Sequence, residues 1–136
     1  MVSKLDQSIN FHRQALGLRS YRQEVLAANI ANADTPNYKA RDIDFTSALQ
    51  NALAGKSGSS LSMATTSNRH LTGTNGTGPA PLLYEKDLQP SADGNTVNMD
   101  VERSKFAENA IQYEASLNFI SGQFKTMLSA IQGQAA

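Results

Sequence analysis

The sequence contains no cysteine and no tryptophan, and its only histidines are His12 and His70. The lack of cysteine excludes disulfides, thiolate nucleophiles and thiolate metal sites. No carboxylate stands at metal-ligand spacing from either histidine, so the sequence predicts no metal site. We expect His12 to lie on the surface or at a helix interface and His70 to be solvated.

The sequence also has no excess of positive or negative charge and no long apolar run. Twelve basic and twelve acidic residues give a net charge of zero, which offers no basic surface to nucleic acid or to an anionic membrane. No stretch approaches the roughly 18 apolar residues of a membrane span. Polar and charged side chains interrupt the N-terminal segment every few positions, unlike the apolar segment of a Sec signal peptide. We therefore expect no cleaved signal, which fits a cytoplasmic protein or export by a route that leaves the targeting segment attached.

Motifs for nucleotide binding and catalysis are missing from the sequence. Gly55-Lys56-Ser57 matches the end of a phosphate-binding loop, but Gln50 stands where that motif requires its first glycine. Asp42 and Asp44 lie two residues apart, a spacing that favours turn formation and helix capping. The serines include no G-x-S-x-G elbow. The sequence predicts no catalytic residue, no cofactor and no small-molecule substrate.

What the sequence does contain begins with a long helix over residues 2–33. Its apolar residues form two stripes on roughly opposite sides, so the helix needs partners on two sides. The alternative is one amphipathic face with scattered exposed apolar residues. Pro36 pushes Thr35 out of the α region, which predicts the helix end near Ala33. The first stripe contains Leu5, Ile9, Leu16, Leu26 and Ile30, and the second contains Phe11, Leu18, Tyr21 and Val25.

A short second helix is predicted over residues 45–54, with Asp44 as its N-cap and Gly55 at its C-terminal end. Residues 55–97 then contain six of the nine glycines and three of the four prolines. Such a stretch has too little periodicity for a compact domain, and we expect an extended, loop-rich arm. Within it, residues 82–84 are a possible strand and Asp93-Gly94 is a turn.

A third helix begins after Asn98, which is its expected N-cap, and carries the strongest pattern in the sequence. Its apolar residues recur with alternating steps of four and three, which is typical of a coiled-coil seam. We expect this heptad stripe to pack on the N-terminal helix, on another chain, or on both, and Ser116 to fall off it. The stripe contains Phe106, Ala110, Tyr113, Leu117, Ile120, Phe124, Met127 and Ile131.

The lengths of the terminal helices predict the shape. Each spans roughly 50 Å at 1.5 Å per residue, whereas a compact globule of this size is under roughly 40 Å across. The predicted fold class is therefore mainly α: an elongated, coiled-coil-like hairpin of the N- and C-terminal helices. Residues 1–54 and 98–136 would form the helical domain and residues 55–97 the arm, with short β segments possible. Because one partner helix cannot cover both stripes of residues 2–33, we expect both ends to be disordered in the isolated subunit.

Two segments resemble a known family. The segment ANIANADTPNY, followed by ARDIDF at 40–45, resembles the A-N-x-A-N-x-x-T-P-G-Y motif of bacterial flagellar rod and hook proteins. Residues 93–133, beginning DGNTVNMD, resemble the C-terminal helix of the proximal rod subunits of that family. Asn37 replaces the usual glycine, and asparagine is the least costly substitute at a positive φ. The motif residues are Ala28, Asn29, Ala31, Asn32, Thr35, Pro36, Asn37 and Tyr38.

The motif also has a physical interpretation. The alanines at 28, 31 and 33 let neighbouring helices approach closely, and the amides of Asn29 and Asn32 can bond to carbonyls at the helix end. Thr35-Pro36 then turns the chain sharply. A subunit whose helices and arm point in different directions needs such a fixed elbow.

The resemblance implies a structural protein of the bacterial flagellum basal body, in the proximal rod. Its helices would form the wall of a tubular drive shaft that transmits torque around the export channel. The implied assembly interface comprises the two stripes of residues 2–33 and the heptad stripe, without Tyr21, Val25 and Ala110. Implied partners are the protein itself, other rod subunits, the adapter protein FliE, the inner-membrane MS ring and the flagellar type III export apparatus, which would deliver it to the periplasm without signal cleavage.

Three alternatives remain open from the sequence alone. The first is a different axial rod subunit, against which DGNTVNMD argues. The second is a soluble helical adaptor or chaperone that binds one partner helix through the heptad stripe. The third is an enzyme such as a cell-wall hydrolase, which lacks any acid/base constellation here.

Overall fold

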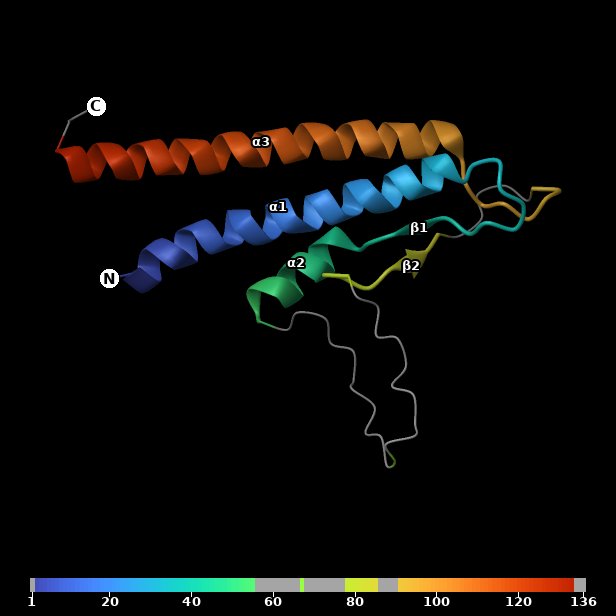
Figure 1. Ribbon diagram of the computed structural model, residues 1–136, viewed down its shortest axis with the longest axis horizontal. Coiled ribbons are helices and arrows are strands. Elements are labelled where there is room, and N and C mark those ends of the chain that lie inside the picture. Colours follow the sequence, from blue (N-terminus) through green and yellow to red (C-terminus); the bar gives the residue numbers. More distant parts are fainter. Residues whose placement is uncertain (1, 56–66, 68–77, 86–90, 134–136) are drawn as a thin grey trace.

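The computed structural model describes residues 2–55, 67, 78–85 and 91–133, and the side chains from residue 9 onward within the first helix. His70 and Lys56-Ser57 lie outside the described residues. The helices are α1 (Val2–Ala31), α2 (Phe45–Leu53) and α3 (Met99–Gln132), and β1 (Arg41–Asp42) pairs antiparallel with β2 (Leu83–Tyr84). Figure 1 shows α1 and α3 as an antiparallel hairpin along the longest axis, with both termini at one end. The predicted mainly α hairpin is confirmed.

The predicted helix boundaries hold to within two residues. Asp44 accepts from the Thr46 and Ser47 N–H groups at 3.1 and 3.2 Å and caps α2. Asn98 caps α3 in the same way, since its Oδ1 accepts from the N–H groups of Asp100 and Val101. The first helix ends at Ala31 because the chain turns from residue 32 onward, slightly before the predicted end.

The apolar core lies between α1 and α2. Leu18, Ile43, Ala48 and Ala80 are buried together, and partly buried side chains surround them. In Figure 1, α2 lies on the opposite side of α1 from α3. The prediction that α1 has partners on two sides is therefore confirmed within one chain, with α3 on one side and α2 and β1 on the other. The surrounding residues are Tyr21, Phe45, Leu49, Ala52 and Leu82.

The contact between α1 and α3 is polar. The buried residues of α3 are Glu102, Asn109 and Ser116, spaced by seven, and we call them the polar seam. Asn109 Nδ2 donates to the Arg19 carbonyl at 2.9 Å and to Gln23 Oε1. These partners show that the polar seam faces α1.

The heptad stripe runs beside this contact instead of forming it. Half of its members, Phe106, Tyr113, Ile120 and Met127, are partly buried along the flank of the polar seam. The other half are exposed, and Ser116 is only 8% exposed. The prediction that Ser116 falls off the seam is wrong, because Ser116 is buried. The prediction that the stripe packs on α1 is wrong for the half of its members that are exposed. Apolar periodicity identifies a stripe on α3, but the hydrogen-bond partners on α1 decide which side of α3 faces α1. The exposed members are Ala110, Leu117, Phe124 and Ile131.

Candidate assembly surface

Asn29, near the end of α1, is fully buried and has hydrogen bonds at both ends of its amide. Its Nδ2 donates to the Arg41 carbonyl at 2.7 Å and to Glu102 Oε2 at 2.8 Å. Its Oδ1 accepts from the Arg41 N–H at 3.2 Å and the Tyr38 hydroxyl at 3.3 Å. The expectation that this amide bonds to helix-end carbonyls is wrong, because the side chain points toward β1 and α3. For Asn32 it is confirmed, since Nδ2 donates to the Ala28 carbonyl at 2.8 Å.

Asn95 holds the turn that follows α1. Its Nδ2 donates to the carbonyls of Asn32, Ala33 and Thr35 at 3.0, 2.6 and 3.0 Å. Its Oδ1 accepts from the Val97 N–H at 2.8 Å, and the residue is 6% exposed. These three carbonyls lie in the turn after Ala31, outside the helix, and the buried amide of Asn95 supplies a donor to them. The segment leading into α3 thereby holds the turn after α1.

The two motif segments lie side by side at the elbow, which we define as residues 32–40. The Asn37 N–H donates to the Asp93 carbonyl at 2.9 Å, and the Thr96 N–H donates to the Tyr38 carbonyl at 3.1 Å. Asn37 has φ of 60°, so the predicted positive φ is confirmed. Gly94 has φ of 72°, and an added Cβ would lie 2.7 Å from Asn37 Oδ1. The close approach of the two segments therefore requires glycine at position 94.

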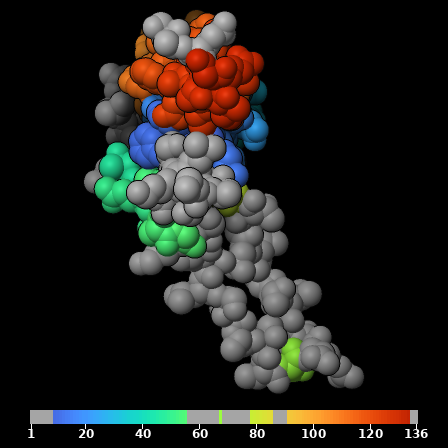
Figure 2. Space-filling model, turned by 90° about the vertical axis from the view of Figure 1, so that its left-hand side faces the viewer, coloured from blue at the N-terminus to red at the C-terminus, as the bar shows by residue number. Residues whose placement is uncertain are grey.

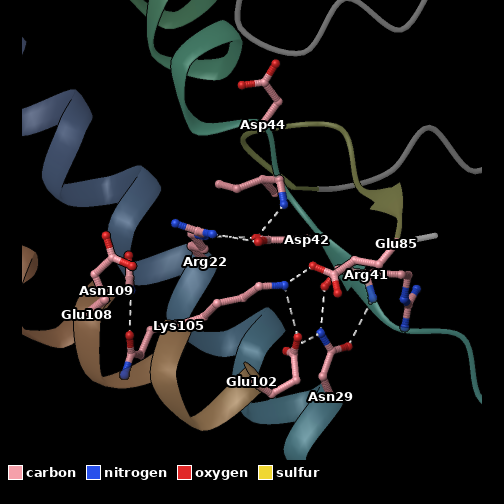
Figure 3. Close-up of polar contacts among 12 residues, drawn as sticks. Arg22, Asn29, Arg41, Asp42, Asp44, Glu85, Glu102, Lys105, Glu108 and Asn109 are labelled. Carbon is pink, nitrogen blue, oxygen red and sulfur yellow. Dashed lines mark hydrogen bonds and ion pairs between the residues drawn. The ribbon is translucent and has the colours of Figure 1, made fainter. Parts of the chain in front are cut away.

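A partly buried ion cluster connects α3 to the end of α1 and to the segment after β2. Figure 3 shows the Lys105 ammonium between the carboxylates of Glu102 and Glu85, with Asn29 on the other side of Glu102. Glu102 is 1% exposed, and Lys105 Nζ lies 3.2 Å from its Oε1. Burial lowers the pKa of Lys105, but the hydrogen bond to Glu85 and the charge of Glu102 outweigh it and raise that pKa. The ammonium therefore stays charged and neutralises the buried carboxylate.

A second ion pair holds β1 against α1. Arg22 donates from Nε to Asp42 Oδ1 at 2.8 Å and from Nη2 to Oδ2 at 2.6 Å, a bidentate pair that Figure 3 shows. The hydrogen bond to Asp42 raises the pKa of Arg22. Asp42 Oδ1 also accepts from the Ile43 N–H at 2.7 Å. Asp42 and Asp44 therefore hold the turn into α2 and cap it, as predicted.

Large apolar side chains are exposed on the half of α3 nearer the C-terminus. Leu117 is 40% exposed, Phe124 52%, Leu128 54% and Ile131 83%. Figure 2 looks onto this end, where α3 (orange to red) lies above α1 (blue) and α2 (green) lies below. Exposed apolar side chains gathered on one helix mark a protein interaction surface.

The apolar residues of α1 are covered to different degrees. Leu18 and Leu26 are buried and Ile9, Leu16 and Ile30 are half-buried, whereas the side chain of Leu5 is outside the described part. Phe11 is 45% exposed. Its ring contacts His12 edge-on, and His12 lies 6.1 Å from the Phe119 ring across to α3. His12 is thus at a helix interface, as predicted.

A shallow groove of about 200 Å³ opens on α1 near the elbow. Ala28 lines it and is exposed, as is Ala31 one turn on. Thr35 and Pro36 are also exposed at the turn. The small side chains predicted to allow close helix approach are therefore open to a neighbour and are not covered by α2 or α3. The remaining lining residues are Tyr21, Glu24, Val25, Tyr38, Arg41 and Leu82.

The described residues contain no group of three or more histidine, aspartate and glutamate side chains that could hold a metal ion. In the same part of the chain, no helix is long and apolar enough to cross a membrane. What the site offers is a rigid elbow and an exposed apolar helix face.

Sequence reasoning missed the roles of Asn95, Glu102 and Asn109. One signal was present for α3, because Glu102, Asn109 and Ser116 recur at seven-residue spacing beside the apolar heptads. A polar residue at a repeated heptad position specifies register and partner. Such a repeat predicts that the contact between the two helices is polar.

Known proteins with similar sequences share one description. Residues 9–39 match the model of a family described as flagella basal body rod protein. Flagellar basal body rod protein FlgB of Escherichia coli K12 is 50% identical over 135 residues, covering 97% of this chain and 98% of that protein. The protein of the same name from Salmonella typhimurium LT2 is 45% identical over 136 residues, covering 98% and 99%. That from Aeromonas hydrophila is 41% identical over 135 residues, again covering 98% and 99%.

Proposed function

The chain belongs to the FlgB family of flagellar basal body rod proteins, and we propose that it builds the proximal segment of the rod. It is a structural subunit of the flagellar basal body rod, and the observation that carries this conclusion is the full-length similarity to FlgB proteins. Within the rod, the terminal helices form the wall of a drive shaft that transmits torque and surrounds the export channel.

The exposed apolar residues of α3 support this mode of assembly. A stripe that α1 leaves half-exposed has apolar area available to a neighbouring subunit. Contacts between different surfaces of successive subunits generate an open helical filament when the rotation between subunits does not close into a ring. The proposed interface therefore comprises the heptad stripe together with Phe11 and the less buried apolar residues of α1.

The elbow supports a division of the subunit into an axial part and an outer arm. We propose residues 1–54 and 98–136 as the axial helical domain and residues 55–97 as the arm. Ala80 in the core and Asn95, which bonds to the elbow, attach two described parts of the arm to the axial part. That attachment sets the direction in which the arm leaves the rod wall.

Assembly with other rod components follows from the family. More specifically, we propose contacts with FliE at the rod base, with the MS ring and, before assembly, with the type III export apparatus. The subunit would reach the periplasm without cleavage of a signal peptide and would act without catalysis. The interrupted N-terminal pattern supports the proposed export route.

Complementation of a strain lacking its own FlgB tests the proposal. Restored motility, with side-chain density for this sequence at the base of the rod in a map of isolated basal bodies, is the expected result. Density elsewhere in the rod would identify a different axial subunit. Recovery of the protein only in the cytoplasm would favour an adaptor and contradict the proposal.

A further inference from the structure

Two stripes run side by side along α3, and only one of them is fully buried, whereas half of the other is exposed. The polar seam (Glu102, Asn109 and Ser116) is buried, and the heptad stripe is displaced from it by about 50° around the helix at 3.6 residues per turn. A small rotation of α3 about its own axis would therefore bring the heptad stripe against α1. In that arrangement the apolar residues of the stripe would be buried within one chain and would not be available to a neighbouring subunit.

Hydrogen bonds between side chains oppose this rotation. Asn109 reaches the Arg19 carbonyl and the Gln23 amide, Arg19 reaches Gln112 Oε1, and Asn29 reaches Glu102 at 2.8 Å. Every one of these contacts joins α1 to α3, and Asn29, Glu102 and Asn109 are at most 1% exposed. A rotated α3 would separate these groups, and a buried polar group without a partner is destabilising.

We infer that the polar seam is an orientation device: it fixes the rotation of α3 so that the apolar stripe stays exposed for assembly. A fully apolar seam would hold the hairpin together but would let the helix turn its stripe inward. Polar residues at heptad positions are known to select one register among alternatives of similar apolar packing. The link to assembly rests on the proposed function, whereas the orientation of α3 is a property of the single chain.

The test uses the absence of cysteine from the chain. Ala110→Cys places a thiol on the exposed edge of the heptad stripe, and Ala107→Cys places one on the exposed side away from α1. Each is introduced into the parent chain and into a Gln23→Leu/Asn109→Leu variant with an apolar seam. A Ser20→Leu/Asn118→Leu variant adds one exposed leucine to each helix and serves as the matched control. Labelling rates are measured on the full-length monomer with a maleimide reagent.

The expected result is several-fold slower labelling at position 110 in the apolar-seam variant, with little change at position 107 or in the control. Equal rates at position 110 in the two backgrounds would overturn the inference, whether or not rods form. If circular dichroism shows that the leucine pair loses helix, Gln23→Met/Asn109→Met replaces it, because methionine adapts more easily to the seam.

A second measurement separates this inference from the proposed function. In cells, the apolar-seam variant should be exported but enter rods several-fold less than the control. Slower labelling at position 110 with normal rod assembly would overturn the link between stripe exposure and assembly. Failure of the parent chain itself to enter rods would count against the proposed function and leave the labelling result for α3 intact.

Discussion

Amide side chains hold the elbow together at the scale of single residues. Asn29 and Asn95 each use both ends of an amide, donating from Nδ2 and accepting at Oδ1. An amide is suited to this place because it carries a donor and an acceptor without a charge that would be desolvated. Two distant parts of the chain are joined in this way without a disulfide.

Asn95→Ala is predicted to lower the free energy of unfolding by about 1–3 kcal/mol, because the carbonyls of the turn after α1 lose their buried donor. Asn95→Asp should be more destabilising, since it replaces the donor with a negative charge at a helix C-terminus. Urea unfolding followed by circular dichroism measures both. Asn51→Ala, on the exposed side of α2, is the control and should change stability by about 0.5 kcal/mol or less. A loss from Asn95→Ala no larger than that from Asn51→Ala would show that donation from Nδ2 is not the stabilising contact.

Two carboxylates make the fold sensitive to acid. The Ser47 hydroxyl and N–H lower the pKa of Asp44, and the Asn95 N–H followed by the Ser91 hydroxyl lowers the pKa of Asp93. A pKa that is lower in the folded state stabilises the fold above the unfolded value of about 3.9, and the stabilisation is lost as pH falls through the folded pKa. Unfolding free energy should therefore decline below about pH 4 through these two groups.

The Asp44→Asn/Asp93→Asn variant should show a shallower decline in acid, because asparagine keeps an acceptor oxygen but does not titrate there. Thermal unfolding across an acid pH series measures the slope. An unchanged slope in the double variant would mean that other carboxylates cause the acid sensitivity.

At the scale of elements, α3 combines a surface for its own chain with a surface for its neighbours. The polar seam faces α1, while Leu117, Phe124 and Ile131 remain exposed beside it. Adjacent residues therefore have different roles, and Ser116 and Leu117 are the clearest pair. Ser116 is 8% exposed and Leu117 is 40% exposed.

Three aspartate substitutions separate the two surfaces. Ser116→Asp buries a charge without a partner, so it should destabilise the isolated hairpin by at least about 1–3 kcal/mol. Leu117→Asp should change monomer stability by less, but should abolish rod assembly while export continues, because the charge lies on the proposed interface. Asn118→Asp, at an exposed position, is the control for both and should leave motility close to normal.

The measurements are urea unfolding of the monomer and swarming of complemented cells. Normal swarming with Leu117→Asp would show that this stripe is not an assembly contact. A larger loss of monomer stability from Leu117→Asp than from Ser116→Asp would contradict the orientation of α3 against α1.

At the scale of the whole molecule, the hairpin is packed at its elbow end and open at its termini. The buried residues described in α1 lie between Ala15 and Asn29, and those of α3 between Glu102 and Ser116. The two helices diverge toward the termini in Figure 1. An element without buried contacts has little to hold it in a monomer, since isolated helices are marginal in water.

Amide exchange of the dilute monomer should therefore be slow in residues 15–30 and 99–116 and fast in residues 117–132. The two apolar stripes of residues 2–33 predict low protection from amide exchange along both helices. Because the residues near the elbow are buried, we expect low protection only in the half of the hairpin near the termini. Incorporation into rods should then protect residues 117–132. Equal protection of 99–116 and 117–132 in the monomer would show that the hairpin needs no neighbour to order its ends.

The sequence by itself determined the three helices and their boundaries to within two residues, whereas β1 was not predicted. Helix periodicity, the capping residues Asp44 and Asn98, and Pro36 after α1 act over a few residues, so their effect can be read locally. The predicted positive φ at Asn37 has the same local origin. The length of the terminal helices also determined that the molecule is elongated.

Only the tertiary structure decided which side of each helix meets which partner. The heptad stripe predicted an apolar seam, but Glu102 and Asn109 face α1 because they bond to Asn29 and Arg19. These partners lie 73 and 90 residues earlier in the chain, so a local sequence pattern does not reveal them. The hydrogen bonds of Asn95 to the turn after α1 and the pairing of β1 with β2 likewise join segments far apart in sequence. Apolar periodicity reports where a stripe lies on its own helix. The rotation of that helix against another is set by specific polar contacts, which appear only when both helices are in place.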